Sequence, residues 1–303
     1  MDNKPLVSII MNCYNSDTYL RDALDSIYGQ TYCQWEVIFW DNGSTDLSSE
    51  IAKSYDSRIK YFLADTTTPL GEARNLAMKK AKGKYIAFLD CDDLYFEDKL
   101  ELQVNMMEKD DFSMCYGGAI IIDESSYIIN KEPARYQSGN VFPNLLSRYE
   151  INMQSVMLRR SILIETGLTF STDMKYCPDH NLFMEVASRF KVGVINKYVV
   201  KYRIVKESLS KKTMHLVSSE IKLTLDAIIN RKPDIRAVYN AEFNSAYAKL
   251  NYYDAINYIS LGEISNARRI IRDVIFVRWE YFALFVILFF PISNNFLLRL
   301  LKR

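Results

Sequence analysis

The sequence lacks several features that would assign it to common classes of protein. Its five cysteines are odd in number, and no two of them have the spacing of a metal-binding pair. That arrangement argues against a structural zinc site or a framework of disulfides. No G-x-G-x-x-G follows the first predicted strand, which disfavours a dehydrogenase. The net charge of +1 gives no sign of a nucleic-acid partner, and we expect none.

The sequence also lacks segments of the kind that carry a chain into or across a membrane. Residues 1–5 have neither the basic start nor the apolar stretch of a signal peptide. The apolar run Tyr281–Phe290 is shorter than the roughly 20 residues that a transmembrane helix needs. We therefore expect a cytoplasmic protein with reduced cysteines.

The C-terminal tail is apolar and basic, whereas the rest of the chain is mildly acidic. Such a segment can lie in a membrane interface, and each basic residue contributes about 1 kcal/mol near an anionic leaflet. We predict that the tail makes a peripheral contact with the inner face of the cytoplasmic membrane. The alternative is that Tyr281–Phe290 packs on the body of the protein.

Strand and helix signals alternate through the N-terminal third. Short apolar runs predict buried parallel strands, and apolar residues at helical spacing, as in Leu20, Ala23, Leu24 and Ile27, predict helices between them. This alternation predicts an α/β fold with a mostly parallel sheet and helices on both faces. The predicted strands are 6–11, 36–40, 59–63 and 85–89, and the later helices are 47–55 and 70–81, with Gly83 in a left-handed cap.

The middle and the end of the chain have weaker signals. Strands are predicted at 119–122, 127–129, 154–158, 192–195 and 198–204, and a helix begins at 181. Beyond about 215 the sequence is mostly helical. Residues 241–275 have the small and aromatic residues of a tetratricopeptide-like hairpin, although one copy is not an array and an ordinary helical hairpin fits as well.

Polar residues follow three of the predicted strands, at 12–15, 41–46 and 90–93. Ligands of parallel sheets bind outside the carboxyl ends of the strands, so we expect these clusters to converge. Asp90 and Asp92, separated by one residue, can together hold a divalent cation that also binds a ligand's phosphates. The alternative is a solvated acidic turn that caps the next helix.

These clusters belong to a series of motifs that resembles the family 2 glycosyltransferases, which have the GT-A fold. The motifs are Val7–Asn15, Gln30–Thr31, Asp41–Asp46, Gly71–Asn75 and Phe88–Asp93. They occur in the family's order and spacing over residues 6–95, and the resemblance continues more weakly to about 205. It implies a Rossmann-like GT-A domain over residues 1–215, followed by a helical extension over residues 216–303.

The resemblance also implies a nucleotide-sugar site, and we expect the donor to be a UDP-sugar. Asn12 and Tyr14 would lie near the base, and Asp41 or Asn42 would contact the base or the ribose. The family often has two aspartates at the latter pair. The amide of Asn42 can both accept and donate a hydrogen bond, which leaves the identity of the base open.

The same resemblance assigns Asp90, Cys91 and Asp92 to the ribose and diphosphate, with Mn²⁺ or Mg²⁺ as the cofactor. Asp92 would be the direct metal ligand, assisted by Asp90. Arg74 would face the donor, or it would form a salt bridge to the acidic loop.

The matching position for the general base is Asp179, because proline precedes it where relatives carry another acid. A base must reach the acceptor hydroxyl, and burial commonly raises its pKa. Asp179 would otherwise only cap the following helix. His180 is a second candidate, although packing or acceptor contact is the usual role at its position.

One departure from the family concerns the metal. Relatives often place a histidine in a Tyr-Arg-x-His segment, but Val205 stands there in this sequence and His215 is ten residues further on. The cation would then depend on Asp92, donor phosphates and water. The segment from Lys201 to Lys212 is basic, and it would either close over the diphosphate or form a solvated face.

Together these features predict an inverting, metal-dependent glycosyltransferase. The acceptor would be a hydroxyl of a glycan, carried on a lipid, in bacterial surface-polysaccharide synthesis. A sugar-nucleotide nucleotidyltransferase would need a glycine-rich basic loop after the first strand, which is absent from residues 12–15. A non-catalytic glycan-binding or scaffold protein would not need the aspartate pair together with Asp179.

Overall fold

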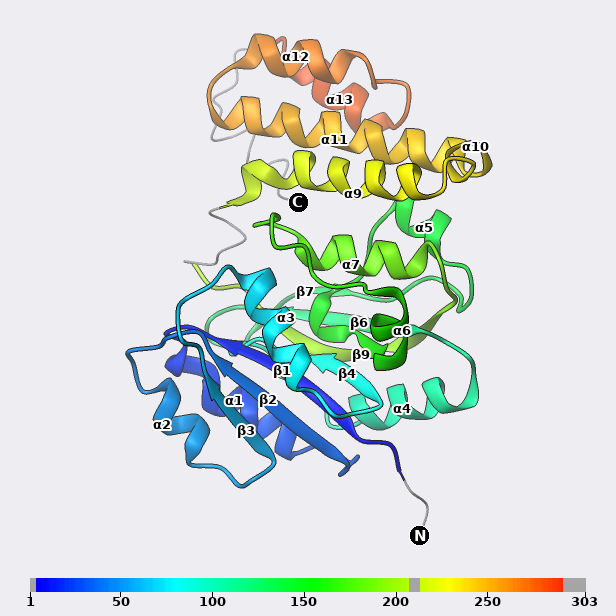
Figure 1. The fold of residues 1–303 in the computed structure, drawn as a ribbon. Helices are drawn as coiled ribbons and strands as arrows, with labels where there is room; N and C mark the ends of the chain where they lie inside the picture. Colours follow the sequence, from blue (N-terminus) through cyan, green and yellow to red (C-terminus); the bar gives the residue numbers. More distant parts are fainter. Residues whose placement is uncertain (1–3, 207–212, 291–303) are drawn as a thin grey trace. The chain divides into compact units, whose positions relative to one another are not determined.

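The computed structural model describes residues 4–206 and 213–290. The chain forms two compact units. The first consists of residues 1–142 and 150–208, and the second consists of residues 143–149 and 209–303. Each unit is described by itself below (Figure 1).

The first half of the sheet in the first unit is parallel. It consists of β1 (Val7–Cys13), β2 (Trp35–Asp41), β3 (Ile59–Leu63) and β4 (Tyr85–Phe88), in the spatial order β3-β2-β1-β4. The predicted strands agree with these to within two residues. Their carboxyl ends therefore meet at one edge of the sheet, which is the edge that binds ligands in open α/β sheets.

The second half of the sheet is mixed and continues in the order β4-β8-β6-β9-β5, with β7 paired to β6. Its strands are β5 (Leu94–Tyr95), β6 (Met114–Ile122), β7 (Ile128–Glu132), β8 (Met157–Arg159) and β9 (Val192–Arg203). β9 runs parallel to β6 and antiparallel to β5. The α/β fold class and its mostly parallel sheet are thus confirmed, with antiparallel strands added beyond β4.

Several predicted boundaries in this half were wrong: β6 begins five residues before its predicted start and β7 ends three residues after its predicted end. Two further errors have a structural explanation. A strand was predicted from residue 154, but Met153–Ser155 form a short 3₁₀ helix, η1, and β8 begins at Met157. The side chain of Asn152 caps η1 by accepting a hydrogen bond from the backbone of Gln154. The two strands predicted at 192–195 and 198–204 are one strand, β9, whose register shifts opposite Gly117 and Gly118. The shift interrupts the alternation of side chains, which made one strand resemble two.

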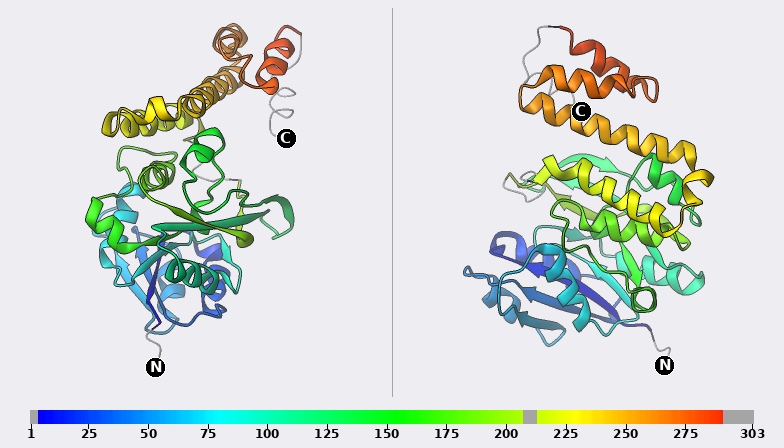
Figure 2. Two further views of the ribbon diagram at one scale, coloured as in Figure 1. Left: turned by 90° about the vertical axis from the view of Figure 1, so that its right-hand side faces the viewer. Right: turned by 45° about the horizontal axis from the view of Figure 1, so that its top comes forward.

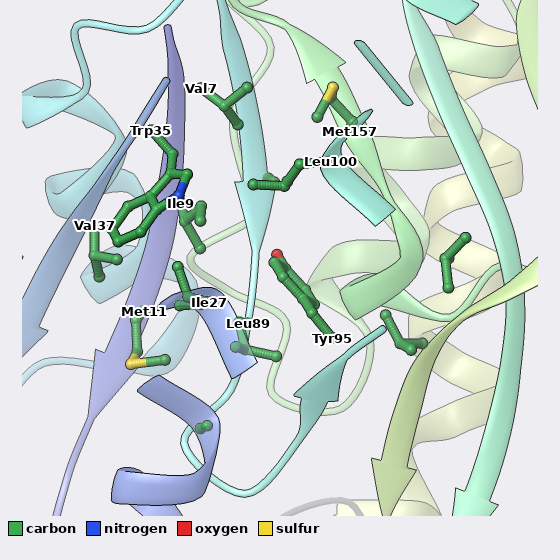
Figure 3. Close-up of a cluster of buried hydrophobic side chains, with 14 of the residues drawn as sticks. Val7, Ile9, Met11, Ile27, Trp35, Val37, Leu89, Tyr95, Leu100 and Met157 are labelled. Carbon is green, nitrogen blue, oxygen red and sulfur yellow. The ribbon is translucent and has the colours of Figure 1, made fainter. Parts of the chain in front are cut away.

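Helices cover both faces of the sheet. Odd-numbered residues of β1 face α1 (Asp17–Tyr28) and α4 (Lys99–Lys109) in one large core (Figure 3). There Val7, Ile9 and Met11 lie with Ile27 of α1 and Leu100 of α4. Neighbouring residues in a strand point to opposite faces.

The other face packs against α3 (Leu70–Lys80) and α7 (Pro178–Ala187). On that side Phe88 of β4 lies against Phe170 and Phe183, with ring centroids 5.4 and 6.2 Å apart. The shorter helices of the first unit are α2 (Ser48–Lys53) and α6 (Arg160–Thr166), and α5 (Phe142–Ser147) begins at its boundary.

Gly83 does not form the left-handed cap predicted after α3. The residue that caps α3 is Ala81, in an extended conformation, and Gly83 is not among the residues with positive φ. Glycine is needed there because a Cβ would lie 2.6 Å from the backbone nitrogen of Ser8. The close approach lets the backbone N–H of Gly83 donate to the buried Ser8 hydroxyl, which in turn donates to Glu36.

We expect Gly83→Ala to destabilise the first unit by about 1–3 kcal/mol, the usual cost of overpacking a core. The two nearest atoms that a new methyl group would meet are the backbone nitrogen of Ser8 and the carbonyl oxygen of Leu6, which cannot rotate away. Thermal or urea unfolding measures the change. Gly29→Ala is the matched control, because its Cβ would meet no atom closer than 3.4 Å. Equal stability of the two variants would contradict this explanation.

The second unit is helical. Its longer helices are α9 (Val217–Arg231), α11 (Asn240–Ser260), α12 (Ile264–Arg272) and α13 (Trp279–Ile287), with the short α10 (Ile235–Val238) and η2 (Met214–Leu216). α11 packs on both α9 and α12, and α12 packs on α13 (Figure 2). The hairpin predicted for 241–275 is formed by α11 and α12, joined through Gly262 with φ +80°. In the part of the chain that the structure describes, every helix is too short or too polar to span a bilayer.

Candidate functional site

The loops that follow β1, β2 and β4 converge, as the sequence predicted. The backbone N–H of Asn42 donates to the carbonyl of Cys13 at 2.8 Å, and that of Thr45 donates to the side chain of Asn15 at 2.7 Å. The thiol of Cys91 donates to the carbonyl of Asn12 at 3.4 Å. These bonds join three segments that are distant in sequence at one edge of the parallel sheet (Figure 1).

The predicted base-binding residues differ in how accessible they are. The ring of Tyr14 is exposed and can meet a ligand, whereas the amide of Asn12 is enclosed and has no hydrogen-bond partner among the described residues. A buried amide with no partner is costly and fits a site that a ligand completes. Asp41 is buried and accepts hydrogen bonds from the backbone of Ser44 and the hydroxyl of Tyr61.

Asn42 is already occupied by protein contacts. Its amide donates to the carbonyl of Thr68 at 2.8 Å and accepts from the backbone N–H of Thr68 at 3.2 Å. This pair of bonds ties the loop after β2 to the segment that leads into α3. In this arrangement Asn42 positions the loop, and a role in reading the base would require those bonds to open.

Asp90 is held on two sides. Arg74 approaches its carboxylate at 3.2 Å, so the structure contains the salt bridge that was one of the two predicted roles of this arginine. Gln154 donates to the carboxylate at 2.7 Å and accepts from the backbone N–H of Asp90 at 3.2 Å. Since Arg74 and Gln154 are almost fully buried, Asp90 has a fixed orientation.

Within the described part of the chain, the carboxylate of Asp92, unlike that of Asp90, is not held by neighbouring side chains. The Asp92 side chain is partly buried and accepts no hydrogen bond from any other residue that the structure describes. Burial, and then the charge of Asp90, raise the pKa of Asp92 to about 6. The adjacent Asp93 is fully buried, and one of its carboxylate oxygens accepts from the backbone N–H of Arg203 at 2.7 Å.

This environment of Asp92 fits a divalent cation. A carboxylate that has no donor and is repelled by a second carboxylate is stabilised when a positive charge arrives. Residues 4–206 and 213–290 contain no group of three His, Cys, Asp or Glu side chains arranged for a metal. Such a cation would therefore take most of its ligands from phosphate and water, as Mg²⁺ commonly does.

Asp179 lies in the first turn of α7, after the N-cap residue Cys177, so it does not occupy the capping position itself. Burial raises its pKa, the charge of Arg74 opposes the rise, and Asp90 adds to it. Asp179, Arg74 and Asp90 are therefore close enough to act on one another electrostatically. His180, the second candidate for the base, is buried.

In the motif Gly71–Asn75, two residues have packing roles in addition to the charge that Arg74 supplies. A Cβ at Gly71 would lie 2.4 Å from the carbonyl oxygen of Ser171. Asn75 donates to the carbonyl of Phe170 and accepts from its N–H, at 2.8 and 2.9 Å. These contacts hold α3 against the segment that precedes α7 and so bring Arg74 and Asp179 to the same region.

Two residues of this region were not predicted as site residues. Gln154 was read as part of a strand, and nothing in its local sequence signals its contact with Asp90, 64 residues away. Tyr202 has a pKa raised by burial and then by the charges of Asp93, Asp90, Asp92 and Asp179, so it belongs to the same electrostatic environment as these carboxylates. The sequence predicted a basic segment without a histidine here and gave no role to Tyr202 itself.

Arg203 anchors the same segment to the aspartate loop. Its Nε donates to the carbonyl of Asp92 at 2.9 Å, and Nη1 donates to the hydroxyl of Ser126. Val205 occupies the position of the absent histidine. Lys211 and Lys212 of the predicted basic closure lie outside the described residues, so that closure remains a prediction.

The sequence comparisons agree with this geometry. The model of the family "Glycosyl transferase family 2" matches residues 8–167. The chain belongs to glycosyl transferase family 2. The family predicted from the five motifs is confirmed, and the matched range includes the three converging loops, Arg74 and Gln154, but ends before Asp179.

Among the relatives of this family 2 glycosyltransferase is the Escherichia coli UDP-Glc:alpha-D-GlcNAc-diphosphoundecaprenol beta-1,3-glucosyltransferase WfgD. It is 34% identical over 208 residues, which are 68% of this chain and 79% of WfgD. A glycosyltransferase of Rickettsia felis is 36% identical over 200 residues, 65% of this chain and 33% of the relative. The chain thus spans about a third of the length of that relative.

A solved structure of S. aureus TarS in complex with UDP-GlcNAc has a TM-score of 0.67 with this glycosyltransferase. The match covers 88% of this chain and 81% of the TarS chain, at 17% identity. At that identity the likeness shows the fold alone, and it confirms the predicted GT-A fold.

Proposed function

We propose that this glycosyltransferase moves a sugar from a nucleotide-diphosphate sugar to a hydroxyl of a lipid-linked glycan acceptor. The observation that carries the proposal is the grouping of Asp90, Asp92, Asp179 and Arg74 beside the converging loops. In this group Arg74 supplies a positive charge, Asp92 supplies a carboxylate that can bind a metal ion, and Asp179 supplies a carboxylate that can accept a proton.

The reaction is a single in-line displacement. The acceptor hydroxyl loses its proton to a carboxylate oxygen of Asp179 as its own oxygen bonds to the anomeric carbon. The bond between that carbon and the diphosphate oxygen breaks, and the nucleoside diphosphate leaves with the electron pair. Attack opposite the leaving group inverts the configuration at the anomeric carbon. The raised pKa of Asp179 suits a general base, because a base works best when its pKa approaches the working pH.

Asp92 would hold Mn²⁺ or Mg²⁺, which when bound offsets the negative charge that develops on the departing diphosphate. The chain's own residues orient this region. Gln154 and Arg74 fix Asp90, and Arg203 fixes the backbone of Asp92. Preorganised charges of this kind act with little reorganisation during the reaction.

The relatives support the substrate classes. WfgD is named for a UDP-Glc donor and a GlcNAc-diphosphoundecaprenol acceptor, and TarS was solved with UDP-GlcNAc. We therefore propose a UDP-sugar donor and an acceptor on a polyprenyl diphosphate, within bacterial surface-polysaccharide synthesis. A lipid-linked acceptor requires work at the membrane surface, so we place the enzyme peripherally on the cytoplasmic face, through the apolar and basic tail.

Incubation with a panel of nucleotide sugars tests the proposal. We expect slow, metal-dependent hydrolysis of a UDP-sugar in the absence of acceptor, because water replaces the acceptor hydroxyl. Addition of EDTA should abolish the release of UDP, and Mn²⁺ or Mg²⁺ in excess should restore it. Synthesis of a sugar nucleotide from a sugar phosphate and UTP would instead show a nucleotidyltransferase. The absence of any turnover or binding across the panel would favour a non-catalytic protein.

A further inference from the structure

A cluster of positive charge in the second unit has no role in the reaction above. Arg278, at the start of α13, donates to the carbonyl of Ser147 at 2.8 Å, which places it beside the end of α5 and the following Arg148. Lys249 of α11 lies with its ammonium 5.4 Å from the ring centroid of Tyr253. Within the described residues, neither Lys249 nor Arg278 forms an ion pair with a carboxylate.

The three cations act on one another. The rings of Tyr252 on α11 and Tyr281 on α13 stack with centroids 5.0 Å apart, which brings the two helices together three residues from Lys249 and from Arg278. Burial, and then the charges of Arg278 and Arg148, lower the pKa of Lys249 to about 8. The acid next to Arg278 in sequence is Glu280, whose charge acts on Tyr252 and Tyr281 and is not among those acting on Lys249. A partly buried lysine that is repelled by neighbouring arginines is stabilised when an anion binds beside it.

Exposed aromatic side chains flank Arg278 in the sequence. Phe276 is 94% exposed and Trp279 is 74% exposed, on either side of Arg278. Further along α13 and just after it, Phe282, Phe289 and Phe290 are also exposed. Large aromatic residues that are exposed to water and lie beside basic residues are typical of segments at a membrane surface.

We propose that Lys249, Arg278 and Arg148 bind the phosphate of an anionic membrane lipid, while Phe276 and Trp279 enter the apolar part of the leaflet. The charge of the cluster selects an anion, and the adjacent aromatic residues select one that is attached to a bilayer. The inference rests on the membrane contact in the proposed function and assigns a specific site to it.

Co-sedimentation with lipid vesicles tests the site, with phosphatidylcholine alone or mixed with phosphatidylglycerol. The wild-type chain should bind the mixed vesicles more tightly. A generic surface charge changes such binding by about fivefold. Lys249→Gln and Arg278→Gln should each weaken binding by about tenfold or more. The matched control Lys232→Gln removes an exposed charge of the same unit and should cost about fivefold at most.

Two further measurements separate binding from folding. Lys249→Gln should raise the melting temperature, because it removes a partly buried charge that neighbouring arginines repel. Arg278→Lys should retain vesicle binding. Vesicle-free hydrolysis of the nucleotide sugar should not change in Lys249→Gln, so the failure of this site and of the proposed reaction would be distinguished. Equal losses in Lys249→Gln and Lys232→Gln, or equal binding to both vesicle types, would overturn the proposal.

Discussion

Replacement of Asp179 by asparagine is expected to lower turnover by about 10²–10⁴-fold, the usual contribution of a positioned general base. The amide cannot accept the proton of the acceptor hydroxyl, but it has nearly the same shape as the carboxylate. A purely structural role at the start of α7 would therefore leave turnover intact. The measurement is single-turnover transfer to an acceptor at saturating donor.

Asp173→Asn is the matched control, because this exposed aspartate precedes the same helix. We expect it to retain wild-type turnover. If Asp179→Asn did so as well, Asp179 would be removed from the mechanism and His180 would become the candidate base.

The raised pKa of Asp179 gives the same experiment a pH dependence with a definite sign. Transfer requires the ionised carboxylate, so the rate should fall as pH falls through the pKa of Asp179, which lies above the ordinary value of 3.8. The contribution of Asp179 to the stability of the folded protein has the opposite pH dependence. An acid whose pKa is raised in the folded state is favourable there when protonated, and that advantage is lost as pH rises. Asp179→Asn should therefore increase the free energy of unfolding at neutral pH while turnover falls.

Replacement of Asp92 by asparagine is expected to reduce metal-dependent turnover by about 100-fold or more, since changes even around a metal ligand cost 10–100-fold. The variant keeps the size of the side chain and removes its charge. Its turnover should be poor at ordinary Mn²⁺ concentrations and should recover only in part as Mn²⁺ is raised. The matched control is Asp98→Asn, on the same segment, where the carboxylate forms an exposed ion pair with Lys197.

Wild-type metal dependence in Asp92→Asn would show that the cation lies elsewhere. Asp90 is a poor substitute, because Arg74 and Gln154 already occupy its carboxylate.

The parallel half of the sheet could be predicted because its signals are local. The runs that became β1, β2 and β4 are mostly apolar and almost wholly buried, as strands covered on both faces must be. The turn residues that follow them mark where each strand ends. The position of Asp92 at the end of such a run was therefore accessible from the sequence.

The contacts that arrange the site could not be predicted in the same way. The bonds of Gln154 to Asp90 and of Asn42 to Thr68 join distant segments, and no periodicity reports them. Gly83 was assigned to a helix cap because glycine commonly serves there, whereas the structure requires it for a close approach to β1. In each case a tertiary contact determined the role of the residue and local preference did not.

The central claim is that a cation and a nucleotide diphosphate share the edge of the sheet at Asp92. Calorimetric titration of UDP into the protein, with and without Mn²⁺, tests it most directly. The account predicts that Mn²⁺ tightens UDP binding in the wild type and that Asp92→Asn loses most of this coupling. Equal affinity for UDP with and without Mn²⁺, or unchanged coupling in Asp92→Asn, would contradict it.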